Sequence, residues 1–228
     1  MSRNSFAPDP RADTHLPDRQ RWDRRYAASH PTVNKAMMPL LATWLPRLPR
    51  RGLALDVAAG AGRHSLALAR HGLRVHALDI SWQGLRLLRA RAVPPLEIRP
   101  LVIDLRRGWL PEASYRVIVN FLYLERALWP AMARRLAPGG WLIVETFTVE
   151  QRRLAPGKYI RPEFLLEPGE LRAAFSFLEI VHYAEGVHNG KATAQLVARK
   201  GLGAAGFPLS SHKRERGGGG EQSEPGEG

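Results

Sequence analysis

The chain has 228 residues, 44% of them hydrophobic, and no cysteine; it has room for one sizeable domain, and disulfides and thiolate metal sites are excluded. No apolar run approaches the roughly 20 residues of a membrane helix, and the N-terminus is polar and proline-rich, unlike a signal peptide. We therefore expect a cytoplasmic protein. The net charge is +13, of which +12 lies within residues 27–200. A core this basic favours anionic ligands or nucleic acid, although the arginines are scattered and the composition also suits a GC-rich genome.

Both ends of the chain differ from its middle in composition. Residues 1–18 combine prolines with charges, and residues 201–228 form a low-complexity tail rich in glycine and glutamate. Neither composition can pack a core. We expect a disordered arm over 1–18, one folded domain over 19–200 and a disordered tail over 201–228.

The elements predicted between these ends alternate between helix and strand. Residues 33–48 show apolar positions at helical spacing, interrupted by Pro39. Residues 53–81 predict a buried strand, a glycine turn, a helix and a second strand, and Ser81 can cap the next helix, which runs to about residue 92. The later predicted elements are strands at 96–105, 115–124, 141–147, 177–184 and 192–199, with helices at 125–136 and 168–175.

This order predicts an α/β fold. We expect a Rossmann-like, doubly wound sheet of seven mostly parallel strands, closed by an antiparallel pair at the carboxy-terminal end. Pro138-Gly139-Gly140 should form a tight turn into the fifth strand, and the last two strands should be joined across residues 186–190.

The glycine turn after the first strand indicates a ligand at the carboxyl ends of the strands. A dinucleotide fingerprint would need a third glycine where this chain has Ser65. Asp56 would also repel a diphosphate. A carboxylate at this position suits a ligand with a cationic ammonium or sulfonium group.

The run Asp56-Val57-Ala58-Ala59-Gly60-Ala61-Gly62 resembles motif I (D/E-x-G-x-G-x-G) of class I S-adenosylmethionine-dependent methyltransferases. Asp79 after the second strand, Asp104 after the third and the Pro138-Gly139-Gly140 turn match that family as well, so the resemblance covers about residues 21–200. Ala58 stands where the family has its first motif glycine. The sequences WDRRY at 22–26 and IVETF at 143–147 resemble the tellurite-resistance-like, small-molecule methyltransferases within it.

The resemblance implies a role for each matching position. S-adenosylmethionine would be the cofactor, with Asp56 near its amino group and Asp79 accepting hydrogen bonds from both ribose hydroxyls. The implied cofactor-binding residues are Asp56, Ala58, Ala59, Gly60, Gly62, Asp79, Ile80, Asp104, Leu105 and Asn120. Ile80 would cover an adenine face, Asp104 and Leu105 would meet the adenine edge, and Asn120 would face the donated methyl. We assign no metal ligand.

Several side chains admit two interpretations. Asn120 is a catalytic candidate or a structural amide, and Asp104 a cofactor ligand or an ordinary loop carboxylate. His64 is more typical of a helix surface than of a base. Trp22 and Tyr26 are a lid over the cofactor or a hydrophobic anchor. In the polar loop over 148–166, the basic residues Arg152, Arg153, Lys158 and Arg161 bind an anionic substrate or are solvated.

The acceptor is open among three hypotheses. A small molecule or a metalloid oxyanion is favoured by the subfamily resemblance. An RNA or DNA base is the alternative, because of the basic core; Asn120-Phe121-Leu122-Tyr123 keeps the ends of the N-P-P-Y/F motif of amino-methylating enzymes but lacks both prolines. A non-catalytic scaffold that binds the cofactor is the third, since no general base is identified. The sequence does not predict an oligomeric state.

Overall fold

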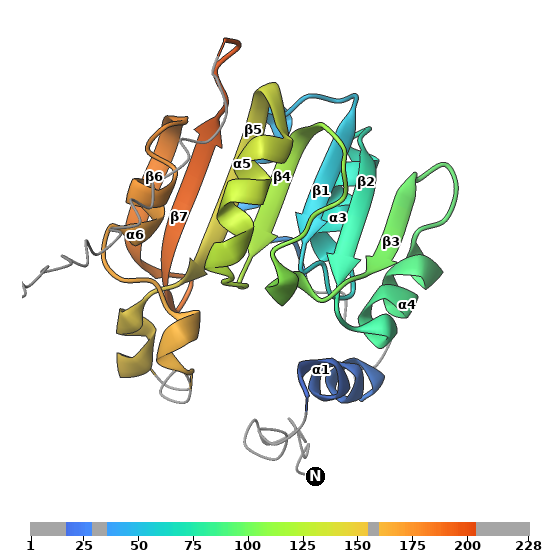
Figure 1. Ribbon diagram of the computed structural model, residues 1–228. Helices are drawn as coiled ribbons and strands as arrows, with labels where there is room; N and C mark the ends of the chain where they lie inside the picture. The colour runs from blue at the N-terminus through green and yellow to red at the C-terminus, as the bar shows by residue number, and fades with distance from the viewer. Residues whose placement is uncertain (1–16, 29–35, 155–159, 204–228) are drawn as a thin grey trace, which may run out of the picture.

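The computed structural model describes residues 17–28, 36–154 and 160–203. Its centre is a seven-stranded sheet in the order β3-β2-β1-β4-β5-β7-β6 (Figure 1). β1 to β5 pair in parallel, and β7 is antiparallel to both β5 and β6. The strands are β1 (Leu53–Val57), β2 (Arg74–Asp79), β3 (Ile98–Val102), β4 (Tyr115–Phe121), β5 (Leu136–Phe147), β6 (Glu179–His188) and β7 (Lys191–Arg199). The expected fold class is confirmed.

Helices cover both faces of this sheet (Figure 1). The α-helices are α1 (Asp18–Ala27), α2 (Pro39–Trp44), α3 (Arg63–Arg70), α4 (Trp82–Arg91), α5 (Trp129–Arg135) and α6 (Glu170–Ala174). Short 3-10 turns include η1 (Leu45–Arg47), η2 (Leu105–Arg107), η3 (Arg126–Leu128), η4 (Val149–Arg153) and η6 (Pro162–Phe164). Helices α2, α3 and α4 pack on one face, and α5 and α6 pack on the other. Within the described ranges no helix is both long and apolar enough to cross a membrane.

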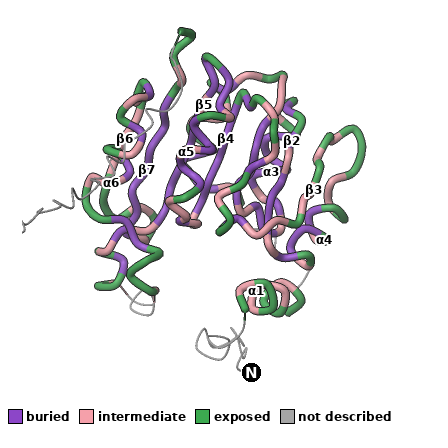
Figure 2. The backbone as a smooth tube through the Cα atoms, viewed as in Figure 1, coloured by how far each residue is buried: buried purple, intermediate pink, exposed green. Residues whose placement is uncertain are grey.

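The core follows the alternation of side chains along the strands. In β1, Ala54 packs on the face of α2 and α3, and Leu55 and Val57 pack on the face of α5. Figure 2 shows the central strands buried and α1 without any buried segment. Helix α1 lies at the carboxyl ends of the parallel strands, beside α4 (Figure 1).

The helix expected from residue 33 begins only at Pro39. Residues 33–35 lie outside the described part of the chain, and 36–38 are not helical. Met38 is extended, with φ −64° and ψ 143°, because a residue before proline is driven out of the α region. Pro39 itself fits the first helical position, where its missing N–H costs nothing.

Two turns differ from the expectation in their placement. The Pro138-Gly139-Gly140 turn lies inside β5 rather than before it, since pairing resumes at Trp141 after an interruption that follows Leu136. Strand β6 extends through Gly186, so that the hairpin turns at Asn189-Gly190, both with positive φ. The predicted arm and tail lie outside the described residues, except for 17–18 and 201–203, and their disorder stays a prediction.

Candidate active site

The loop from β1 to α3 turns back sharply at the carboxyl edge of the sheet. Ala58, Gly60 and Gly62 have φ values of 58°, 57° and 79°. The N–H of Ala59 donates to the carbonyl of Leu78 at 2.8 Å, which fixes the loop to β2. Ala58 therefore adopts the left-handed conformation that the family motif gives to glycine, at a cost of about 1 kcal/mol.

Asp79 at the end of β2 joins two loops. Its Oδ2 accepts a hydrogen bond from the N–H of Gly60 at 2.7 Å, and its Oδ1 accepts one from the N–H of Ser81 at 2.8 Å. The residue is only 6% exposed, and this burial raises the pKa of its carboxyl despite the backbone hydrogen bonds that lower it. Each oxygen retains further acceptor capacity, so the carboxylate can still receive two hydroxyl groups.

Asp56 in β1 is fully buried beneath the same loop. Its Oδ2 accepts a hydrogen bond from the hydroxyl of Ser65 at 2.6 Å, and its Oδ1 has no hydrogen-bond partner among the described residues. Burial raises the pKa of this carboxyl to about 7, with the Ser65 hydrogen bonds and the charge of Arg63 acting in the opposite direction. Most buried carboxylate oxygens have a hydrogen-bond partner, so the free Oδ1 is an acceptor that a ligand donor could use.

Asp104 lies after β3 and contacts Arg106 rather than the glycine loop. Its Oδ1 accepts from the backbone N–H and the Nε of Arg106, and its Oδ2 accepts from Nη2 of the same side chain at 2.7 Å. These hydrogen bonds lower the pKa of Asp104. Arg106 also reaches Asp18 at the start of α1, 3.1 Å away. Leu105 is buried and Ile80 is half-buried at the same edge.

Helix α1 lies over the glycine loop, where one of the two interpretations placed a lid. A Cβ built on Gly60 would lie 2.2 Å from the hydroxyl oxygen of Tyr26, and one built on Gly84 would lie 3.0 Å from its ring. Asp23 fastens the helix, because its Oδ1 accepts from the Ser81 hydroxyl at 2.6 Å and from the N–H of Gln83 at 3.0 Å. Tyr26 therefore covers the loop directly. The attachment through Asp23 was not predicted from the sequence.

His64 is not on a helix surface, and that prediction was wrong. The side chain is 4% exposed, and its ring centroid lies 4.2 Å from that of Phe121. Its Nε2 accepts a hydrogen bond from the N–H of Met38 at 3.3 Å. Burial, with the nearby charge of Arg63, lowers the pKa of His64 to about 3. A neutral imidazole with an occupied Nε2 links α3 to the start of α2.

Asn120 and Glu145 lie near the carboxyl ends of β4 and β5, and both are 1% exposed. Oδ1 of Asn120 and Oε2 of Glu145 have no hydrogen-bond partner among the described residues, whereas Oε1 of Glu145 accepts from the hydroxyl of Thr193 at 3.1 Å. Glu145 pairs with Phe121 across the strands, so by alternation it lies on the α2–α3 face and Asn120 on the α5 face. The two side chains thus start from opposite faces of the sheet.

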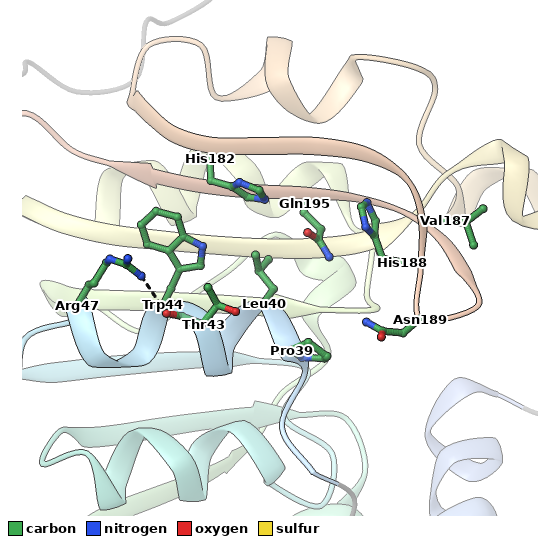
Figure 3. A pocket seen from close by; sticks show the side chains of 10 residues that line it. All are labelled: Pro39, Leu40, Thr43, Trp44, Arg47, His182, Val187, His188, Asn189 and Gln195. Atoms are coloured by element: carbon green, nitrogen blue, oxygen red, sulfur yellow. Dashed lines mark hydrogen bonds between the residues drawn. The ribbon is translucent and has the colours of Figure 1, made fainter.

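A hollow of about 530 Å³ lies between α2 and the β6–β7 hairpin (Figure 3). Trp44 and His182 face each other across it, with ring centroids 6.0 Å apart, and the Arg47 guanidinium lies 5.0 Å from the Trp44 ring. Its full lining is Pro39, Leu40, Thr43, Trp44, Arg47, His182, Val187, His188, Asn189 and Gln195. No residue of the glycine loop lines it, so this hollow is distinct from the predicted cofactor site.

The basic loop after β5 is described only in part, because Lys158 lies outside the described residues. Arg153 pairs with Glu150 at 2.5 Å, and Arg161 lies 3.8 Å from Glu163. Arg152 is exposed. Two of these arginines therefore have acidic neighbours, as in a solvated loop.

A family of known proteins matches the part of the chain that contains the glycine loop. Residues 54–140, from β1 to the turn inside β5, match the family model described as a methyltransferase domain. This match supports the expected enzyme class over the scaffold hypothesis. No curated protein matches the chain by sequence.

Solved structures share the fold of this chain. TehB from Haemophilus influenzae superposes with a TM-score of 0.63 and 20% identity, over 78% of this chain and 67% of that one. The magnesium protoporphyrin IX methyltransferase ChlM from Synechocystis, with SAH bound, has a TM-score of 0.58 and 17% identity, over 82% and 89%. The N-methyltransferase NodS from Bradyrhizobium japonicum has a TM-score of 0.55 and 18% identity, over 82% and 99%. At these identities the likeness establishes the fold, and the tellurite-resistance-like subfamily stays a prediction.

Proposed function

We propose that the protein is an S-adenosylmethionine-dependent methyltransferase that acts on a small molecule. The observation that carries this proposal is the buried Asp56, whose free Oδ1 lies beneath a glycine loop. The ammonium group of the cofactor supplies the donor that this oxygen lacks, and a diphosphate would be repelled. The chemistry of the site therefore fits S-adenosylmethionine and disfavours a dinucleotide.

The roles of the other residues follow from their places on the sheet edge. Asp79 receives the two ribose hydroxyls, because its carboxylate is held in place by Gly60 and Ser81. Ile80, Asp104 and Leu105 line the side where the adenine ring is placed. The backbone from Ala58 to Gly62, which includes Ala59, passes beneath the methionine part, and Asn120 faces the methyl group.

The bound cofactor supplies a methyl group on a positively charged sulfur, which is already an activated leaving group. The protein's own contribution is to orient the acceptor and exclude water. Tyr26 and α1 cover the glycine loop and so shield this region from solvent. His64, with its low pKa and occupied Nε2, is not the general base.

A small-molecule acceptor is supported by how the arginines are used. Arg106, Arg126 and Arg135 form ion pairs with neighbouring carboxylates, so these three guanidinium groups are engaged within the protein. A metalloid oxyanion belongs to the same proposal, and an RNA or DNA base is the alternative that the +13 charge favours. The cytoplasmic location expected from the composition stays a prediction.

The test of the cofactor site is Asp79→Ala, with S-adenosylmethionine binding measured by calorimetry. Loss of two hydrogen bonds to a charged group weakens binding by at least about 100-fold. The same change removes the acceptors of Gly60 and Ser81 and lowers the free energy of unfolding by about 1–3 kcal/mol, so circular dichroism must show that the variant is folded. Glu97→Ala, at an exposed carboxylate before β3, is the control. Unchanged affinity in Asp79→Ala would refute the site.

A further inference from the structure

Glu145 is a buried carboxylate that has no assigned role in the proposed cofactor site. It lies in β5, and its neighbours in the sheet are Phe121 on β4 and Gln195 on β7. The hydroxyl of Thr193 satisfies Oε1, and Oε2 has no hydrogen-bond partner among the described residues. The side chain thus has half of its acceptor capacity unused in a place that solvent barely reaches.

An unused buried carboxylate oxygen is unfavourable for folding. Leaving a buried acceptor unsatisfied costs about 1–3 kcal/mol, and more when the group is charged. Glutamine, which has nearly the same shape, would avoid burying a charge. Glu145 therefore lowers the stability of the free protein, and a ligand that donates a hydrogen bond to Oε2 would remove this loss.

The residues around Glu145 indicate which kind of ligand can bind to its free Oε2. Asp56 lies on the same face of the sheet, and Arg63 carries a charge that both carboxylates stabilise, since they raise its pKa while burial lowers it. Phe121 on the adjacent strand and His64 at the start of α3 contact each other through their rings, and Nε2 of His64 already accepts a hydrogen bond. Asp56 is assigned to the cofactor, and Arg63 offsets part of the carboxylate charge. The acceptor that remains, Oε2 of Glu145, suits an N–H group of an organic amine and does not suit an oxyanion.

The position of Glu145 in the topology places it on the acceptor side. The strand order reverses between β1 and β4, and ligands in such sheets bind at this switch point. The loops after β1, β2 and β3 hold the residues assigned to the cofactor. Glu145 lies beyond the switch point, two strands from β1 and two residues before the end of β5.

We propose that Oε2 of Glu145 binds an N–H group of the methyl acceptor, and that the acceptor is therefore an organic amine. This inference rests on the proposed methyltransferase function and narrows its substrate class. Glu145 recognises the amine and orients its nitrogen, while the aromatic pair of Phe121 and His64 contacts the carbon skeleton. A metalloid oxyanion is disfavoured by the same carboxylate.

The test is labelled methyl transfer from S-adenosylmethionine to a cell extract separated into four fractions. These are small molecules retained by cation exchange, small molecules retained by anion exchange, RNA with DNA, and protein. Label is expected in the cation-exchange fraction, and Glu145→Gln lowers that transfer by at least about tenfold. Glu179→Gln, at an exposed carboxylate that begins β6, is the matched control and retains full transfer.

Two further readouts separate recognition from structure. Calorimetry shows unchanged binding of S-adenosylmethionine to Glu145→Gln, because the cofactor residues lie elsewhere. The melting temperature of Glu145→Gln stays close to that of the unchanged protein, because removal of a buried carboxylate with one unbonded oxygen offsets the lost attraction to Arg63. A purely structural carboxylate would instead lower it.

Three outcomes would overturn the inference. One is label outside the cation-exchange fraction: label in the anion-exchange fraction leaves the proposed small-molecule methyltransferase intact, whereas label in nucleic acid or protein leaves only the methyl transfer from S-adenosylmethionine. Another is full amine methylation by Glu145→Gln. Absence of label in every fraction would overturn the proposed function itself, and the amine assignment with it.

Discussion

The two halves of the sheet edge differ in how far the protein satisfies its own polar groups. On the half formed by β1, β2 and β3, both oxygens of Asp79 accept backbone hydrogen bonds and Asp104 is paired with Arg106. On the half formed by β4, β5 and β7, Asn120 and Glu145 each leave a buried oxygen unpaired. The first half is held in place by the protein's own hydrogen bonds, whereas the second keeps acceptors that the described residues do not fill. Asp56 stands at the border and combines both conditions, with one oxygen bonded and one free.

The largest expected effect concerns Asp56, the residue between the two halves of the sheet edge. Removing its charge tests whether its unpaired oxygen makes the folded protein less stable. The raised pKa means that between about pH 4 and pH 7 the unfolded chain releases a proton that the folded chain keeps. Asp56 therefore makes the protein less stable as pH rises through this window, by on the order of 3–4 kcal/mol in total.

Asp56→Asn removes this pH dependence. We expect a flatter curve of unfolding free energy against pH from 4 to 8, measured by urea denaturation, and higher stability than the unchanged protein at pH 8. The direction for Asp79 is the same, so part of the slope remains. A slope that is not reduced in Asp56→Asn would mean that the Asp56 carboxylate is not the cause.

A smaller effect is expected at Ala58, which tests how well preorganised the cofactor half is. Ala58→Gly relieves the left-handed backbone at φ 58° and should raise the free energy of unfolding by about 1 kcal/mol. Ala61→Gly, in the same loop but without positive φ, is the control and should lower it by about 0.5–1 kcal/mol. Equal destabilisation by both changes would show that Ala58 carries no strain.

The smallest effect is expected at Arg106, which joins the third strand to α1. The side chain is 54% exposed, so its ion pairs with Asp104 and Asp18 are worth at most about 1 kcal/mol. Arg106→Gln should speed amide hydrogen exchange in α1 by less than about fivefold, and less at high salt. Arg89→Gln, exposed on α4, should not change that exchange. An effect in α1 that salt does not reduce would contradict an ionic link.

The parts of the fold predicted from sequence depend on local patterns. The buried strand, the glycine turn and the Ser81 cap each lie within a few residues, and the cap is present, with the Ser81 hydroxyl accepting from the N–H of Gly84. Proline chemistry explains why α2 begins at Pro39, although helical periodicity extended the prediction to residue 33. Spacing alone does not distinguish a helix from the extended segment before it.

The contacts that sequence did not predict join residues far apart in the chain. Met38 donates to His64 across 26 positions, Thr193 to Glu145 across 48 and Ser81 to Asp23 across 58. No local pattern encodes such a pair. The apolar residues around His64 in α3, all buried with it, were the one signal against a surface position.

The attachment of α1 has a consequence for how the covered loop can be reached. None of its own residues is fully buried, but Tyr26 covers Gly60 and Gly84, and Asp23 holds the buried Ser81. The sensitivity of an opening to denaturant scales with the surface it exposes. Release of this one helix exposes less surface than unfolding of the sheet, so urea should promote it less strongly than it promotes global unfolding. Access to the loop is then set by the contacts of Tyr26, Asp23 and Asp18 rather than by the stability of the whole domain.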